Sequence, residues 1–238
     1  MAWNRTPLDP KWVPLMAAWR ARQKELTSRV IEVPLRPLPR FVAGADAALS
    51  PDREWVLAAV VVWDRMTREV IESVHGAARA EYPYIPGYLG FRESPALEKA
   101  FRKLTVPFGA VLFDGMGKAH PRRCGIAVQM AVTLDVPGIG VGKTRLYGVH
   151  QEPGPEAGSA APLMDRDECI GMVLRTKNKV KPLYISVGHR ADLETAVALV
   201  RACDGGYRLP EPTRLADREA ARFKQEWVAP RHGVSEAP

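Results

Sequence analysis

The chain has 238 residues, and its 34 Lys and Arg against 27 Asp and Glu give a formal net charge of +7. Hydrophobic residues make up 46% of the chain and charged residues 26%, a composition that excludes wholesale disorder. At roughly 150 residues per domain, this length allows one large domain or two small ones. A basic protein of this size is a candidate for an anionic partner such as a nucleic acid, although the charge alone serves solubility equally well.

The cysteines and the apolar runs restrict the cellular compartment. Cys124, Cys169 and Cys203 lie far apart, which argues against a disulfide framework or a zinc ribbon. The longest apolar run, Trp55 to Trp63, is too short to cross a bilayer, and the first residues contain no apolar targeting segment. We therefore expect a cytoplasmic, reduced, monomeric protein without a membrane partner.

The first 40 residues predict an amphipathic helix and a connector. Leu15, Trp19 and Leu26 recur at helical spacing, which predicts a helix over 15–31. The prolines at 34, 37 and 39 then force an extended chain. We expect residues 1–40 to pack on a single catalytic domain over 41–228, which is followed by a flexible tail over 229–238.

The remaining elements predict a mixed sheet. Strands over 41–49, 55–63 and 67–75 with short links imply an antiparallel meander. Helices and strands then alternate, which favours parallel strands covered by helices. The expected helices are 94–104, 123–134, 192–202 and 217–228, the strands are 109–113, 137–142, 169–175 and 183–187, and a mobile loop occupies 148–162. The predicted fold class is α/β, an antiparallel meander plus parallel strands flanked by helices.

Three acidic residues stand where ordinary surface acids are not expected. Asp46 interrupts the apolar strand VAGADAAL, Asp114 ends an apolar strand, and Glu93 directly precedes the helix expected from residue 94. An acid within a buried strand needs a cation or hydrogen-bond donors to offset its desolvation. Taken singly, each acid is more simply explained as the cap of a turn. Together with a basic surface, they suggest a Mg²⁺ or Mn²⁺ site for metal-assisted phosphodiester hydrolysis.

The segments around these acids resemble the endonuclease V family, metal-dependent nucleases that act at deaminated purines, chiefly inosine. The matching segments occur in family order and cover most of Phe41 to Arg218: VAGADAALS, PYIPGYLGFRE, DGMGKAHPRRCG, PGIGVGK, VLRTKNKVKPLYISVGHR, LETA and YRLPEPTRLADR. The resemblance implies a ribonuclease H-like fold and Mg²⁺ as the cofactor, with Mn²⁺ as a substitute. It also implies DNA repair by nicking inosine-containing DNA at the second phosphodiester 3′ to the lesion. An inosine-directed ribonuclease of the same family is the alternative.

The resemblance also assigns catalytic positions. Asp46, Glu93 and Asp114 match the family's metal-binding carboxylates, and Lys143 matches a lysine that would stabilise transition-state charge. Where the family usually has RLAHR, this chain reads RLADR, so Asp217 replaces a histidine and would be a fourth carboxylate ligand. Because this imidazole is missing, a lesion-binding protein with reduced catalysis is a further alternative.

Substrate contacts are implied in three groups. The two prolines of PYIP make a stiff turn that would enter the duplex as a wedge, with a core-packing loop as the alternative. The wedge residues are Pro83, Tyr84, Ile85 and Pro86. Because glycine lets a flat base approach the backbone closely, a pocket for the flipped base is expected around Gly87, Leu89, Gly115, Gly125 and Gly140. His120, Arg92 and Arg122 would support the site, and Arg123 flanks it.

Overall fold

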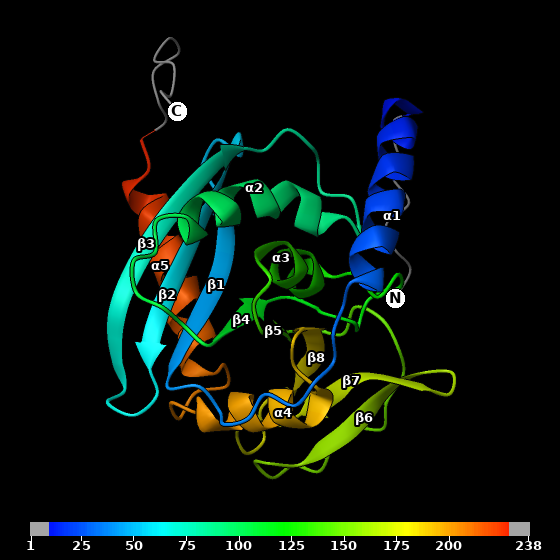
Figure 1. Ribbon diagram of the computed structural model, residues 1–238, viewed down its shortest axis with the longest axis vertical. Helices are drawn as coiled ribbons and strands as arrows, with labels where there is room; N and C mark the ends of the chain where they lie inside the picture. Colours follow the sequence, from blue (N-terminus) through cyan, green and yellow to red (C-terminus); the bar gives the residue numbers. More distant parts are fainter. Residues whose placement is uncertain (1–9, 229–238) are drawn as a thin grey trace.

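The computed structural model describes residues 10–228, so the tail expected over 229–238 lies outside the described residues. One eight-stranded sheet forms the centre, with helices on both of its faces (Figure 1). The strands are β1 (Phe41–Leu49), β2 (Trp55–Asp64), β3 (Glu69–Arg79), β4 (Ala110–Asp114), β5 (Gly138–Gly142), β6 (Ala160–Asp165), β7 (Glu168–Leu174) and β8 (Leu183–His189). The helices are α1 (Val13–Ser28), α2 (Leu89–Phe101), α3 (Ile126–Leu134), α4 (Leu193–Ala202) and α5 (Glu211–Glu226).

The strand order is β3-β2-β1-β4-β5-β8-β7-β6. The meander β1-β2-β3 is antiparallel, and β1, β4 and β5 are parallel neighbours, so the expected mixed sheet is confirmed. Beyond β5 the strands β8, β7 and β6 are antiparallel again. The apolar run of β2 is buried along nearly its whole length because α2 and α5 cover its two faces.

Alternation along the strands divides the core into two layers. Val42, Leu112 and Ile139 face α4 and α5, and their sequence neighbours Ala43 and Phe113 face α2 and α3. The sheet is therefore the middle of three layers, and the side chains of Asp46 and Asp114 fall on the α5 side by the same alternation. This is the expected ribonuclease H-like arrangement.

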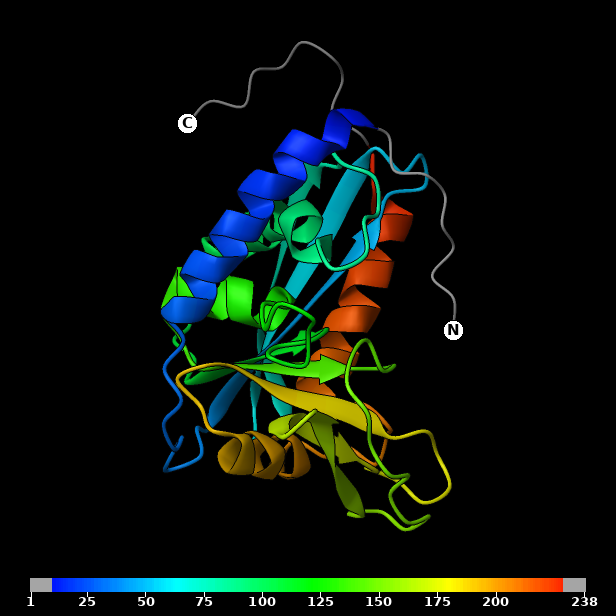
Figure 2. The same ribbon diagram turned by 90° about the vertical axis from the view of Figure 1, so that its right-hand side faces the viewer.

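Helix α1 lies outside the three layers, across α3 (Figure 2). Leu26 packs against Cys124 and Val128, and Trp19 packs against Ile85. After α1, the chain is attached to the sheet by a hydrogen bond from the Ile31 backbone N–H to His189 Nδ1. Within residues 10–228, no helix is both long and apolar enough to span a membrane.

Several sequence-based boundaries were wrong, and three of them change how a segment is understood. The helix expected from residue 94 begins at Leu89, so Ser94 is not its N-cap but accepts a hydrogen bond from Gln129 Nε2 of α3. The last helix begins at Glu211, not at residue 217, because a proline is accommodated in a first turn that lacks intrahelical N–H partners. The loop expected over 148–162 ends at residue 159, because β6 begins at Ala160 and pairs with β7.

Candidate active site

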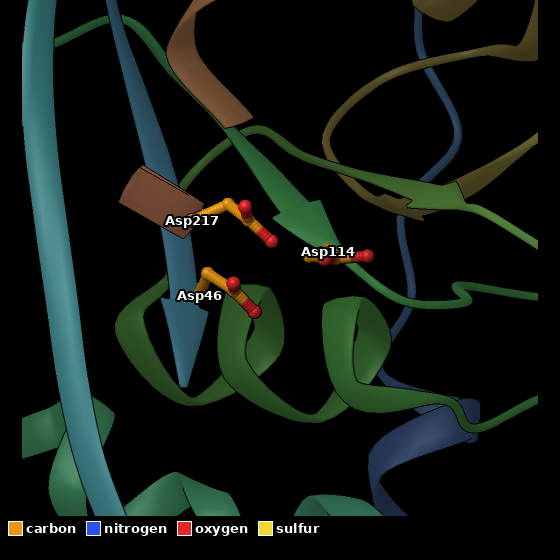
Figure 3. A group of neighbouring side chains, drawn as sticks. All are labelled: Asp46, Asp114 and Asp217. Carbon is orange, nitrogen blue, oxygen red and sulfur yellow. The ribbon is translucent and has the colours of Figure 1, made fainter. Parts of the chain in front are cut away.

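Three aspartates from three separate elements meet at one end of the sheet. Asp46 comes from β1, Asp114 ends β4, and Asp217 lies in the second turn of α5. One carboxylate oxygen of each lies within 4.8 Å of one from each of the others (Figure 3). The meeting follows from alternation, because residues 42, 44 and 46 of β1 and residues 110, 112 and 114 of β4 share the face covered by α5.

The close approach of α5 to β1 depends on glycine. A Cβ on Gly44 would lie 1.9 Å from the carbonyl oxygen of Pro212, in the first turn of α5. Only a residue without a side chain allows this helix to rest on the strand backbone. Asp46 lies two residues after Gly44 in β1, and Asp217 lies five residues after Pro212 in α5. The contact between Gly44 and Pro212 therefore sets the distance between the two aspartates.

The aspartates repel each other in a partly dehydrated setting. Burial, and after it the neighbouring Asp114, raise the pKa of Asp46 above its usual range. Burial also raises the pKa of Asp114, and repulsion from Asp217 raises it further. A cation among the three oxygens would relieve both effects, and carboxylates are the ligands that Mg²⁺ prefers.

Lys143 supplies one positive charge at this position. It follows β5 directly, and its Nζ lies 2.5 Å from Asp114 Oδ2 and 2.7 Å from Asp217 Oδ1. Burial alone would lower the pKa of Lys143, but the hydrogen bonds to the two carboxylates raise it. The lysine is therefore fully protonated at neutral pH.

Glu93 reaches the cluster from the opposite side. The early start of α2 places it inside the first turns of that helix, not ahead of the helix as the sequence suggested. Among the described residues, its carboxylate is not one of the three that gather within metal-ligand distance. Burial, then the charges of Asp46 and Asp114, raise its pKa to about 8.

A pocket of about 240 Å³ opens beside the aspartates. Four of the five predicted base-pocket residues line it, together with Asp114, Lys143, His120 and Tyr84: Gly87, Leu89, Gly115 and Gly125. The fifth, Gly140, was wrongly assigned to the pocket wall. A Cβ on Gly140 would meet the backbone nitrogen of Gly117 at 2.3 Å, so this glycine admits the loop after β4 and does not line the pocket.

The predicted wedge divides into an exposed and a buried part. Tyr84 is 57% exposed at the mouth of the pocket, as a wedge requires. Ile85 is only 4% exposed and packs with Trp19 and Tyr88, so its inclusion in an exposed tip was wrong and the core-packing alternative holds for it. The apolar side chain of Ile85 attaches the loop to α1, and the neighbouring Tyr84 remains exposed to solvent.

A hydrogen-bonded cluster fixes the end of this loop at the carbonyl of Gly87. Arg122 donates to that oxygen at 2.6 Å and stacks over the Tyr88 ring at 4.2 Å. The Arg122 backbone N–H donates to His120 Nδ1, which assigns the ring proton to Nε2, and Nε2 donates to the Gly87 carbonyl at 3.2 Å. Burial and the nearby Arg122 lower the pKa of His120 to about 4, so it is neutral here.

Sequence reasoning missed two residues that position this site. Gln23 of α1 donates to the Gly87 carbonyl at 3.0 Å and accepts from Arg122 Nε. Arg208 donates to the Lys143 carbonyl at 2.5 Å and to the Pro182 carbonyl at 3.0 Å. Arg208 lies in the segment YRLPEPTRLADR, which was a signal for it, whereas nothing local in the sequence distinguishes Gln23.

The remaining predicted supports have different surroundings. Arg123 is paired with Asp165 and Glu168 at 2.5 and 2.7 Å, which ties it to the β6–β7 hairpin. Arg92 borders the hollow beside Glu93, and its buried Nε has no hydrogen-bond partner within the described part of the chain. Of the three flanking arginines, Arg92 is the one that lines this hollow.

Comparison with known proteins gives one consistent result. The family model described as Endonuclease V matches residues 24–218. An endonuclease V of Roseiflexus sp. strain RS-1 is 43% identical over 213 residues, which are 90% of this chain and 95% of that protein. The crystal structure of the Streptomyces avermitilis endonuclease V superposes with a TM-score of 0.84 at 41% identity and covers 88% of this chain and 93% of that one.

A more distant structure is evidence for the fold of this chain. Endonuclease V of Ciona intestinalis, solved in complex with a 24mer DNA that contains an inosine, has a TM-score of 0.78 at 24% identity and covers 90% of this chain and 99% of that one. The family model spans most of the 238 residues, and the Roseiflexus relative exceeds 40% identity over nearly its full length. The chain belongs to the endonuclease V family.

Proposed function

We propose that this protein is a Mg²⁺-dependent endonuclease that nicks DNA 3′ to inosine, at the second phosphodiester, as part of DNA repair. The observation that carries the proposal is the meeting of Asp46, Asp114 and Asp217 beside Lys143 at the mouth of a glycine-walled pocket. Family membership supports the reaction class, and the complex of the Ciona intestinalis endonuclease V with inosine-containing DNA supports the choice of inosine.

The residues present fit a hard divalent cation. Three carboxylates supply only oxygen ligands, and a cation would offset the burial and the mutual repulsion that raise the pKa values of Asp46 and Asp114. Asp46, Asp114 and Asp217 would hold the ion, with Glu93 beside them. When bound, such an ion lowers the pKa of a coordinated water and neutralises charge on a phosphate. Mn²⁺ prefers the same ligands and should substitute for Mg²⁺.

The protein's own groups then have separable tasks. Lys143 places a full positive charge next to the carboxylates, where it would stabilise the negative charge that develops on the phosphate. Arg208 holds the backbone carbonyl of Lys143, which fixes the position from which its side chain extends. Asp217, which matches the position of the family's usual histidine, is paired with Lys143, and one of its carboxylate oxygens lies within 4.8 Å of an oxygen of Asp46 and of Asp114. A ligand role for Asp217 is therefore more consistent with the geometry than loss of catalysis.

The pocket provides for recognition of the base. Gly87, with φ of +79°, and Gly115, with φ of +150°, hold backbone conformations that side chains rarely adopt. Exposed backbone N–H and C=O groups in the pocket wall would read the edge of a flipped hypoxanthine, which carries an oxygen where adenine carries an amine. Tyr84, at the pocket mouth, would fill the space that the flipped base leaves in the duplex.

The test is a cleavage assay on matched oligonucleotides with one deoxyinosine, one inosine ribonucleotide or neither, each with Mg²⁺ and with Mn²⁺. We expect one nick per inosine strand, at the second phosphodiester, with 3′-hydroxyl and 5′-phosphate ends. Preferential cleavage of the ribonucleotide substrate would establish the inosine-directed ribonuclease instead. Tight inosine binding without cleavage by either metal ion would establish the lesion-binding alternative and refute the proposal.

Variants connect the assay to the site. Asp46→Ala and Asp114→Ala should abolish nicking but retain binding of inosine DNA, because these residues would hold the metal and not the base. Asp165→Ala is a matched control, since this aspartate is ion-paired to Arg123 outside the triad. Near wild-type nicking by either site variant would contradict the assigned roles.

A further inference from the structure

A second groove runs along α2 next to the candidate active site. Its volume is about 640 Å³, and its walls come from α1, the start of β2, the chain at and beyond the end of β3, and α2. In Figure 1 the connection from β3 to α2 crosses toward α1, so these segments lie together at one end of the molecule. Half-buried aromatic rings, two half-buried cations and one exposed cation dominate the lining: Trp55, Tyr82 and Phe91, then Arg92 and Lys99, and Arg79.

A smaller hollow of about 230 Å³ borders both the groove and the base pocket. The hollow shares Arg92 with the groove and shares Tyr84 and Leu89 with the base pocket. Its wall also contains Arg53 and Glu93. A strand that extended from the base pocket past Tyr84 toward the groove would therefore follow a wall that carries Arg53 and Arg92.

The charges of the groove favour an anion. Three cations line it against one carboxylate, Glu81. Arg79 lies 3.6 Å from Glu54 and over the Trp55 ring at 5.2 Å, so the guanidinium is held at the ring. Arg92 lines both the groove and the smaller hollow, so its positive charge faces both.

The aromatic rings favour bases that are not paired. Phe91 stacks on Trp19 at 5.1 Å, and Tyr82 meets the same tryptophan edge-on at 4.9 Å, so the rings are fixed in position. Fixed rings next to cations are the means by which proteins bind single strands, since bases stack on the rings while phosphates meet Lys and Arg. Bases within a duplex remain stacked on each other and cannot use such rings.

We propose that this groove binds an unpaired stretch of the nucleic-acid strand adjacent to the nucleotide in the base pocket. The inference rests on the proposed function, because it takes a nucleic acid as the substrate. It predicts that the protein prefers inosine sites in locally opened DNA, where the strand on one side of the lesion is free to follow the groove.

The experiment compares three 30-mer probes with a central inosine: a full duplex, and two in which the strand is unpaired on only the 5′ or only the 3′ side. Binding is followed by fluorescence anisotropy in EDTA, which prevents cleavage. The test variant is Arg79→Glu/Lys99→Glu. The control is Arg36→Glu/Arg102→Glu, which makes the same change in net charge at residues that are 66% and 75% exposed and do not line the groove.

We expect the wild type to bind one partly unpaired probe about tenfold more tightly than the duplex. The test variant should lose this preference, and its salt dependence (log K against log salt) should flatten by about 1.4, at about 0.7 per single-strand phosphate contact. The control should keep the preference. No preference in the wild type, or equal losses in both variants, would overturn the inference. A wild type that nicks inosine DNA without any groove effect refutes this inference alone, whereas a wild type that neither nicks nor binds inosine refutes the proposed function.

Discussion

Gly44 provides a sharp test of how the fold sets the distance between two of the aspartates. In the substitution Gly44→Ala, the new Cβ would lie 1.9 Å from the Pro212 carbonyl oxygen and 2.8 Å from the Thr213 nitrogen. Ordinary contacts begin near 3.4 Å, so the two backbones must separate by about 1.5 Å. Because β1 is paired with β2 and β4 on its two edges, the element that moves is α5.

The movement should have two measurable effects. Overpacking at this contact should lower the free energy of unfolding by about 1–3 kcal/mol, which urea denaturation measures. Asp217 moves with α5, away from Asp46 and Asp114, and a misplacement of about 1 Å at a reacting site costs on the order of 100-fold in rate. We therefore expect nicking of an inosine oligonucleotide to fall by about 100-fold, with part of the loss recovered at high Mg²⁺.

The control is Gly154→Ala, where the nearest atom to a new Cβ is the Ser159 hydroxyl at 3.1 Å, the end of a movable side chain. This variant should match the wild type in both assays. If Gly44→Ala nicks within twofold of the wild type at low Mg²⁺ and unfolds at the same urea concentration, the contact between β1 and α5 does not set the site geometry.

Three further predictions follow from the same geometry. Burial raises the pKa of Glu93 to about 8 in the folded protein, against 4.5 in the unfolded chain, so between these pH values only the folded protein keeps the proton. The stability that this proton gives is fully present below pH 4.5 and is lost as pH rises through 8. In EDTA, Tm should fall between pH 6 and pH 9, and Glu93→Gln should reduce this fall; equal slopes in the two proteins would contradict the burial effect. Tyr84→Ala should weaken inosine binding without lowering Tm, whereas Ile85→Ala should cost about 2–5 kcal/mol of unfolding free energy, and the opposite pattern would invalidate the division of the loop. Asp217→His removes the carboxylate 2.7 Å from Lys143 and should weaken activation by Mg²⁺, seen as a higher Mg²⁺ concentration at half-maximal nicking; an unchanged value would argue against Asp217 as a ligand.

The sequence by itself determined the strands and the chemical character of the site. The continuous apolar run of β2 can only be a strand covered on both faces, and an aspartate within β1 is interpretable without coordinates because burial of a lone carboxylate is costly. Strand alternation places Asp46 and Asp114 on one face only when combined with the register of β1 and β4, which the structure supplies. Helix starts were less predictable: α2 begins at Leu89 and continues through Pro95, because packing of this helix on the sheet outweighs local preference.

Only the tertiary structure decided which groups meet. Asp217 and Asp46 are distant in sequence, and their approach depends on a backbone contact at Gly44 that composition does not reveal. The division between exposed Tyr84 and buried Ile85 comes from Trp19 of α1, and the neutrality of His120 comes from its burial beside Arg122 and Gly87. These properties depend on solvent exclusion and on neighbours from other elements, and such neighbours are fixed by packing rather than by local sequence.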